Sequence, residues 1–217
     1  MKAAVHTSYG PPDVVRIAEV EKPAAKDTQV LVKVHATTVN RTDCGMRAAR
    51  PFFIRLFAGL TRPRLTVLGN EFAGEVEAVG RGVTSFTVGD RVFGFDGSRF
   101  GAHAEYLAVP EDGFLATVPA GLTYEEVAPS TEGSLYAQTL IRSAKVRRLL
   151  RPRGLYLSTD LGPLSQNLAL PLVTPLLGGR RVRFPIPRTP DRERVRQFQE
   201  LLASGRSLPA RMSSSRT

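Results

Sequence analysis

The stretch from Leu68 to Phe95, LGNEFAGEVEAVGRGVTSFTVGDRVFGF, most constrains the fold of this chain. Apolar and polar residues alternate over 75–79, which predicts a half-buried strand. Gly80-Arg81-Gly82 predicts a tight turn, because glycine accepts positive φ without steric cost. Gly89-Asp90 marks a second turn, and residues 91–95 have the composition of another strand. The stretch therefore predicts one corner of a small antiparallel β-barrel.

Three segments of this stretch carry a resemblance to a known family. Gly69–Gly74, Val79-Gly80 and Val88–Val92 resemble the signature of the medium-chain dehydrogenase/reductase superfamily. The resemblance is greatest to its zinc-free branch, the quinone oxidoreductases and related NAD(P)-dependent alcohol dehydrogenase-like proteins. It implies a GroES-like β-barrel followed by a cofactor domain. Zinc-dependent members have a histidine ligand after the first glycine, and Asn70 occupies that place here.

The segment Thr38–Arg47 resembles the substrate-cleft segment of the same family. A cysteine that binds catalytic zinc in other members is replaced by Asn40, so the resemblance implies that Asn40 lies near the nicotinamide and the substrate carbonyl. Asp43 matches an acidic position expected to fix the loop through backbone N–H groups. Turn chemistry alone is the alternative for both residues. Thr131 matches a position near the nicotinamide, with helix capping as its alternative.

The sequence does not favour a metal site. Gly101–Pro110 resembles the family's G-x-x-A-E-Y strand, and the four-cysteine lobe that zinc-dependent relatives insert before it is missing. Cys44 is the only cysteine and there are three histidines, with no ligand pairs at metal spacing. His35 is interpreted as a polar residue on a strand.

Further elements can be predicted along the chain. Two strands are expected between Met1 and Glu21, and alternation over 30–36 predicts the clearest single strand. Thr123–Glu126 reads as a capping box that opens a helix. Phe52, Phe53, Leu56, Phe57 and Leu60 fall near helical spacing within residues 50–63. The resemblance implies that this segment is a hydrophobic lid of the cleft that packs against the segment at Asn40, with a membrane-surface helix as the alternative.

The cofactor implied by the resemblance is NAD(P)H, but its phosphate-binding turn is missing from the sequence. No G-x-G-x-x-G stands between a strand and a helix. Residues 147–160 resemble the last helix and strand of a Rossmann domain, which suggests an internally shortened chain joined near Val146–Arg148. Beyond it we predict strands at 154–158 and 181–186 and then a helix. Thr189 and Gly205 are expected to cap this helix, and its core stripe is expected to consist of Val195, Phe198, Leu201 and Leu202.

The predicted fold class is mainly β: a GroES-like β-barrel domain followed by a truncated α/β segment. The expected divisions are a β-domain at 1–122, a bridging helix at 123–146, a Rossmann remnant at 147–205 and a disordered tail at 206–217.

Charge and composition limit the classes of binding partner that this protein is expected to have. The net charge is +10, yet residues 1–145 hold 16 basic and 16 acidic residues, while 146–217 hold 14 arginines and 4 acidic residues. These arginines do not alternate with aromatics, so nucleic-acid binding is not expected. The apolar run 168–177 is too short to span a membrane, and no signal peptide is apparent. We expect a cytoplasmic protein with a small carbonyl or quinone substrate, and homodimers where the shortened segment needs a partner.

Two hypotheses of function follow. The first is a zinc-independent NAD(P)H-dependent oxidoreductase that transfers hydride to a carbonyl, quinone or enone, in a shortened form with little autonomous activity. The second is a non-catalytic GroES-like interaction module or pseudoenzyme.

Overall fold

The computed structural model describes residues 1–144, 155–157, 181–183 and 192–204. The chain divides into two compact units, one of residues 1–132 and 189–217 and the other of residues 133–188. Each unit is described by itself below. Among the described residues, no helix combines the length and apolar character needed to cross a bilayer.

An antiparallel pair of strands begins the first unit. β1 (Lys2–His6) pairs with β2 (Val15–Glu19), and the short 3-10 helix η1 (Pro12–Val14) precedes the second strand. The two strands predicted between Met1 and Glu21 are thus confirmed. Two isolated bridges, Ala3 to Ala104 and Val5 to Val67, join this pair to the rest of the unit.

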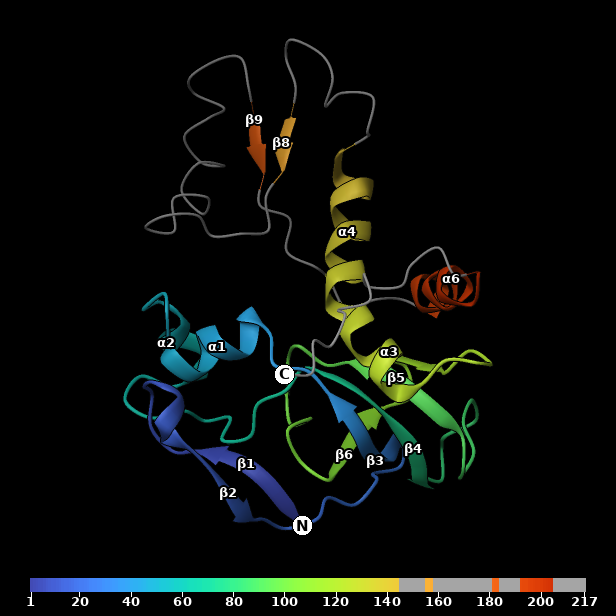
Figure 1. Ribbon diagram of the computed structural model, residues 1–217, viewed down its shortest axis with the longest axis horizontal. Coiled ribbons are helices and arrows are strands. Elements are labelled where there is room, and N and C mark those ends of the chain that lie inside the picture. The colour runs from blue at the N-terminus through green and yellow to red at the C-terminus, as the bar shows by residue number, and fades with distance from the viewer. Residues whose placement is uncertain (145–154, 158–180, 184–191, 205–217) are drawn as a thin grey trace, which may run out of the picture. The chain divides into compact units, whose positions relative to one another are not determined.

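A curled five-stranded antiparallel sheet, half of a barrel, forms the body of the first unit (Figure 1). Its strand order is β6-β3-β4-β5-β7. The predicted mainly β class is confirmed, and the stretch that constrains the fold supplies the antiparallel neighbours β4 and β5. The strands are β3 (Gln29–Thr37), β4 (Glu71–Val79), β5 (Arg91–Phe95), β6 (Tyr106–Pro110) and β7 (Phe114–Thr117).

The alternation in β4 works as the sequence predicts, but the following turn needs glycine for a different reason. Val76 is fully buried, while Glu75 and Glu77 on either side are exposed. Gly80 is not among the residues with positive φ. Instead, a Cβ at Gly80 would lie 1.9 Å from the carbonyl oxygen of Lys26. The expectation of positive φ is therefore wrong, and the requirement is the close approach of two backbone segments.

Two buried clusters stabilise the first unit. One fills the concave side of the curled sheet with branched and aromatic side chains, and Phe86 closes it from the loop before β5. Its members are Val30, Val32, Phe72, Val76, Phe86, Val92, Ala102, Leu107, Val109 and Leu115. The other cluster joins Phe93 and Phe114 of the sheet to the C-terminal helix α6 (Arg192–Ala203).

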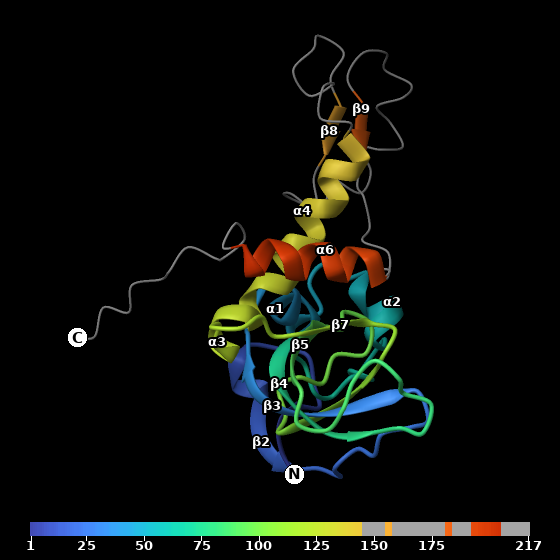
Figure 2. The same ribbon diagram turned by 90° about the vertical axis from the view of Figure 1, so that its right-hand side faces the viewer.

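Helix α6 packs along β7 through an apolar stripe (Figure 2). Val195, Phe198 and Leu202 are buried, whereas Leu201 is 40% exposed. The prediction that Leu201 belongs to this stripe is therefore wrong, because at about 3.6 residues per turn Leu201 lies on the flank of Phe198 opposite to Val195 and Leu202, at the solvent edge of the stripe. The assignment of 147–205 to a Rossmann remnant stays a prediction, although α6 groups with the β-domain.

Two helices follow β3 in the chain, α1 (Arg41–Ala48) and α2 (Ile54–Ala58). The second is shorter than the predicted lid helix because Gly59, at φ 119°, ends it after five residues. Phe52, Leu56, Phe57 and Leu60 are all exposed. The prediction that these side chains pack as a lid against the Asn40 segment is therefore wrong.

The connection toward the second unit contains α3 (Tyr124–Val127), η2 (Ala128–Ser130) and α4 (Thr131–Ala144). The capping box of Thr123 with Glu126 is present in both directions, as predicted. In the second unit, β8 (Leu155–Leu157) pairs in parallel with β9 (Arg181–Arg183), within the two predicted strand ranges. The proposed joint near Val146–Arg148, the caps at Thr189 and Gly205 and the tail lie outside the described residues.

Candidate functional site

Asn40 and Asn70, which occupy the two expected zinc-ligand places, contact each other directly. Asn40 caps the N-terminus of α1, and Asn70 immediately precedes β4. The Asn40 amide donates a hydrogen bond of 2.7 Å from Nδ2 to Oδ1 of Asn70. Residues thirty positions apart are therefore joined at one end of the β3–β4 pair.

Asp43 fixes this arrangement through hydrogen bonds to both of its carboxylate oxygens. It is 2% exposed, and its Oδ2 accepts from the backbone N–H of Asn40 at 3.1 Å, completing the capping box. Its Oδ1 accepts from the N–H of Gly69 at 2.9 Å. The predicted role of Asp43, a carboxylate that holds a loop through backbone N–H groups, is what the geometry contains. The turn-chemistry alternative is also realised, because Asn40 caps α1.

Gly69 must be glycine for this contact to form. Its φ is 88°, and a Cβ there would lie 2.6 Å from both the ring and the backbone nitrogen of His103. His103 in turn hydrogen-bonds through Nε2 to the carbonyl oxygen of Thr38 at 2.8 Å. The loop before β4 is thus held tightly on both sides.

Glu71 is the centre of the polar network, and the sequence reasoning missed it. Its carboxylate is buried at 3% exposure and accepts three short hydrogen bonds and a fourth, longer one from Asn40. The donors of the short bonds are Thr38 Oγ1 at 2.5 Å, Thr131 Oγ1 at 2.9 Å and the backbone N–H of Glu132 at 2.7 Å. Asn40 Nδ2 lies 3.4 Å from the same carboxylate. The available signal in the sequence was a charged residue, Glu71, that directly precedes the small and apolar residues Phe72–Gly74 and the predicted strand after them.

Thr131 is placed beside the other predicted residues, but its side chain is fully buried at 0% exposure. Its hydroxyl donates to Glu71 rather than capping the helix that begins at this residue. The structure therefore brings all four predicted residues, Asn40, Asp43, Asn70 and Thr131, into one network through Glu71. Thr42 and Glu132 join it as well, because the Thr42 hydroxyl donates to Glu132 Oε1 at 2.6 Å.

The surroundings of the Glu132 carboxyl disfavour its ionised form. Burial raises its pKa above the ordinary value, and the nearby negative charges of Glu71 and Asp43 raise the pKa further. The Thr42 hydroxyl opposes this by stabilising the ionised form. A carboxyl whose pKa is raised by folding favours the folded state at low pH and loses that contribution as pH rises through the folded pKa.

Glu132→Gln is therefore expected to raise the melting temperature at pH 7, since the variant has no charge to bury. The gain should shrink as the pH falls through the raised folded pKa and vanish at about pH 3, well below the ordinary pKa of glutamate, where the wild-type carboxyl is protonated in both states. Melting temperatures of both proteins across this pH range test the sign. Glu125→Gln is the matched control, because Glu125 also lies in a first helical turn but is exposed. A gain at pH 7 in the control, or none in Glu132→Gln, would contradict the argument.

One polar atom of the network has no partner. The amide nitrogen Nδ2 of Asn70 is buried and makes no hydrogen bond, although a buried donor without an acceptor is costly. Within the described part of the chain, no group of three or more His, Cys, Asp or Glu side chains is arranged to hold a metal ion. Asn40 and Asn70 supply amides where a metal centre would need thiolate or imidazole.

A separate hollow of about 640 Å³ lies between β1, β2 and β3 and is lined mainly by apolar side chains. Asp43 and His103 border it, but Asn40, Asn70 and Thr131 do not. His35, at the hollow's margin, stacks on Tyr124 with ring centroids 4.9 Å apart, consistent with its predicted role as a polar strand residue. The candidate site is thus the amide and carboxylate network and not this hollow.

Comparison with known proteins places this network in a family context. The alcohol dehydrogenase GroES-like domain matches residues 26–120. The chain is 38% identical over 122 residues to the quinone oxidoreductase of Sus scrofa, covering 55% of this chain and 34% of that protein. It is 34% identical over 136 residues to the chloroplastic NADPH-dependent alkenal/one oxidoreductase of Arabidopsis thaliana, covering 59% of this chain and 33% of that protein. The aligned part therefore spans about a third of either relative.

The fold of the chain also resembles that of a solved structure. The quinone oxidoreductase from Coxiella burnetii superposes with a TM-score of 0.73 at 19% identity, over 98% of this chain and 90% of that chain. Residues 26–120 therefore belong to the alcohol dehydrogenase GroES-like domain family, and the chain resembles quinone oxidoreductases of the medium-chain dehydrogenase/reductase superfamily in sequence and in fold.

Proposed function

We propose that this chain carries the substrate side of a zinc-independent NAD(P)H-dependent oxidoreductase that acts on a carbonyl, quinone or enone. The observation that supports it best is the Asn40–Asn70 pair. Two amides joined by a hydrogen bond stand at the positions that the family resemblance equates with the zinc ligands of other members. The relatives named above are a quinone oxidoreductase and an NADPH-dependent alkenal/one oxidoreductase, which suggests the substrate class.

Asn70 is the residue we assign to orient the reacting group. Its buried Nδ2 lacks an acceptor, and a carbonyl or carboxamide oxygen placed there would satisfy it. Asn40 holds the Asn70 oxygen, so the amide is fixed in orientation with its nitrogen unpaired, and a ligand reaches that buried nitrogen only when the groups covering it move aside. Asp43 and Glu71 act as positioning residues that hold these amides. The nicotinamide cofactor supplies the hydride when it is bound.

The residues present fit only the reacting end of NAD(P)H. The network offers amide and hydroxyl groups, but the sequence has no glycine-rich turn for the pyrophosphate. We therefore propose a shortened form of the family enzyme, with little activity of its own and with homodimerisation as the means of completing its second segment. The cytoplasm is the compartment that we propose for it.

The full chain is expected to show no saturable NADPH binding at ~100 μM, a concentration that fills a site of typical micromolar affinity. Fluorescence quenching and the melting temperature with and without NADPH measure this, together with NADPH oxidation by a quinone and by an enone. The matched control is an intact quinone oxidoreductase under the same conditions. Metal analysis of the same sample is expected to find no stoichiometric zinc.

The outcomes separate the parts of the proposal. Saturable binding with turnover that Asn70→Ala abolishes would keep the oxidoreductase assignment and overturn the claim of little activity. Stoichiometric zinc would overturn the zinc-independent assignment. The proposal expects slow, unsaturated NADPH oxidation; no turnover at any NADPH concentration, even when the chain is assayed as a dimer, would contradict it and favour the second candidate, a non-catalytic GroES-like interaction module. The observation in favour of that candidate is the missing phosphate-binding turn.

A further inference from the structure

An exposed apolar surface surrounds helix α2, away from the candidate site. Four large side chains are mainly solvent-exposed: Phe52 at 71%, Leu56 at 64%, Phe57 at 76% and Leu60 at 63%. We call these four residues the α2 patch. Exposed aromatic and aliphatic side chains gathered in one place mark interaction sites in proteins that are otherwise well packed.

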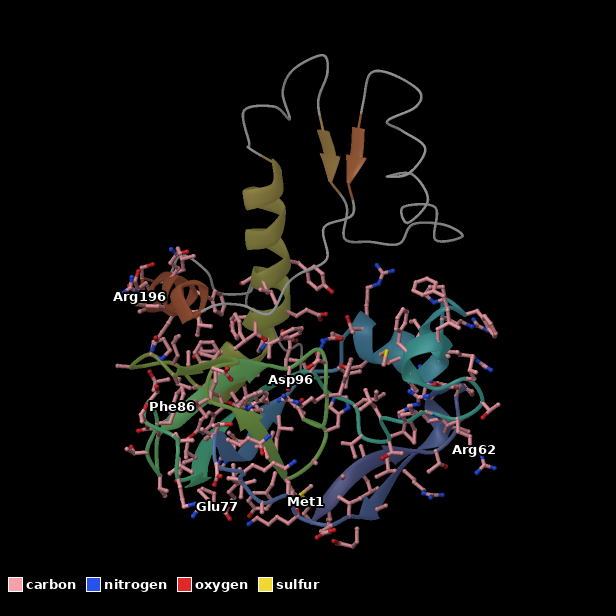
Figure 3. All side chains as sticks on the ribbon, turned by 180° about the vertical axis from the view of Figure 1, so that it is seen from behind. Met1, Arg62, Glu77, Phe86, Asp96 and Arg196 are labelled. Atoms are coloured by element: carbon pink, nitrogen blue, oxygen red, sulfur yellow. The ribbon has the colours of Figure 1, made fainter. Side chains whose placement is uncertain are left out.

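The surroundings of the α2 patch are strongly basic. Residues 44–70 contain five arginines and no acidic residue. Among the described residues, none of these arginines takes part in an ion pair. Arg50, Arg62 and Arg64 are exposed, and Figure 3 shows Arg62 at the outer edge of the molecule beside α2. The apolar side chains therefore have a rim of unneutralised positive charge.

A polar hollow of about 580 Å³ lies at the base of the α2 patch. Arg47, Arg50 and Arg55 line it together with Tyr9 and Phe52, and no acidic side chain does. The Arg55 guanidinium stacks over Tyr9 at 5.0 Å and over Phe52 at 5.3 Å, and its Nε is buried without a hydrogen-bond partner. Guanidinium groups at such a concave site are suited to a phosphate group, whose oxygens accept their N–H bonds.

We propose that the α2 patch docks onto the surface of a bilayer containing anionic phospholipids. The apolar side chains would enter the boundary between headgroups and acyl chains, the arginine rim would meet the negative surface, and the hollow would receive a headgroup phosphate. Five residues of helix are far too few to span a bilayer, so the binding is peripheral. A second copy of the chain is disfavoured as the occupant, because two such patches would bring like charges together. A nucleic-acid backbone would leave the four apolar side chains uncovered.

Co-sedimentation of the full chain with vesicles tests the proposal directly. We expect binding to vesicles of phosphatidylcholine mixed with phosphatidylserine, and much weaker binding to phosphatidylcholine alone. Binding should fall with added salt, because the Debye length shrinks to about 3 Å at 1 M. Phe57→Ser should weaken binding about tenfold through lost apolar burial. Arg62→Gln should weaken it about fivefold through the loss of one surface charge.

The controls remove similar groups elsewhere on the surface. Val88→Ser removes an apolar side chain that is 63% exposed, and Arg16→Gln removes an exposed arginine on β2. Both are expected to bind like wild type. All four variants change exposed side chains, and circular dichroism checks that each retains the fold. Equal binding to neutral and anionic vesicles, or controls as weak as the patch variants, would overturn the proposal. So would self-association that Phe57→Ser removes, without any vesicle binding, since a second copy would then be the occupant.

Discussion

Replacing Glu71 with alanine is expected to lower the free energy of unfolding by about 3–5 kcal/mol. The carboxylate is almost completely buried and accepts hydrogen bonds from the hydroxyls of Thr38 and Thr131 and from the N–H of Glu132. Alanine leaves these donors without an acceptor, and each buried unsatisfied donor costs about 1–3 kcal/mol. Urea unfolding of the full chain, followed by circular dichroism, measures the change.

Glu75→Ala is the matched control for Glu71→Ala. Glu75 lies on the same strand but is exposed, so its replacement is expected to change stability by no more than about 0.5 kcal/mol. Glu71→Gln should give an intermediate loss, because the amide keeps one acceptor but turns an N–H toward groups that are themselves donors. Equal effects of Glu71→Ala and Glu75→Ala would show that the buried network does not stabilise the fold.

Replacing Phe198 with alanine is expected to cost about 3–5 kcal/mol and to loosen helix α6. The Phe198 ring is fully buried and contacts Phe93 edge-on, with centroids 6.0 Å apart, and Phe114 at 5.7 Å. Alanine leaves a cavity between the helix and the sheet, where the surrounding side chains can collapse only in part. Unfolding in urea gives the stability change, and limited proteolysis within residues 192–204 reports detachment of the helix.

Leu201→Ala controls for the loss of a large apolar side chain from the same helix. Because Leu201 is 40% exposed, its replacement is expected to cost about 0.5 kcal/mol and to leave proteolysis unchanged. If the two variants proved equally destabilising, α6 would not be held to the sheet through Phe198. If Phe198→Ala lost stability without added cleavage, the helix would be held mainly by its other contacts, such as the Gln199 amide to Thr117.

These contacts give α6 a place in the β-domain that the chain order does not suggest. The helix lies more than 70 residues after β7, yet the cluster around Phe198 belongs to the same core as Phe93. We infer that a core stripe of Val195, Phe198 and Leu202 stabilises the β-domain in the full chain. A shortened chain that ends before residue 192 is therefore expected to expose Phe93 and Phe114.

The candidate site shows where sequence reasoning succeeds and where it falls short. The family resemblance singled out Asn40, Asp43, Asn70 and Thr131, and the structure brings these four residues together, while their role stays a prediction. Glu71 was missed although it stands beside Asn70, since a glutamate at a buried strand position has no periodic signal of its own. Its role arises from three donors that lie 33, 60 and 61 residues away.

The sequence by itself determined the local elements. The alternation over β3 and β4 and the capping box at Thr123 act over a few residues, where propensity and hydrogen bonding are fixed by neighbours. Most of the apolar stripe of α6 was predicted correctly for the same reason. Periodicity, however, cannot say what faces a stripe, and so it placed Leu201 in the core. The resemblance likewise made the α2 patch a lid packed on the Asn40 segment, which the structure does not show.

Only the tertiary structure decided which segments meet. It joined Asn40 to Asn70, held Gly69 against His103, brought α6 back to the sheet and left the α2 patch in solvent. These outcomes depend on long-range packing and on hydrogen bonds between residues far apart in the chain, which no local pattern encodes. Gly80 illustrates the physical reason, because its lack of a side chain matters only where a distant backbone segment approaches it.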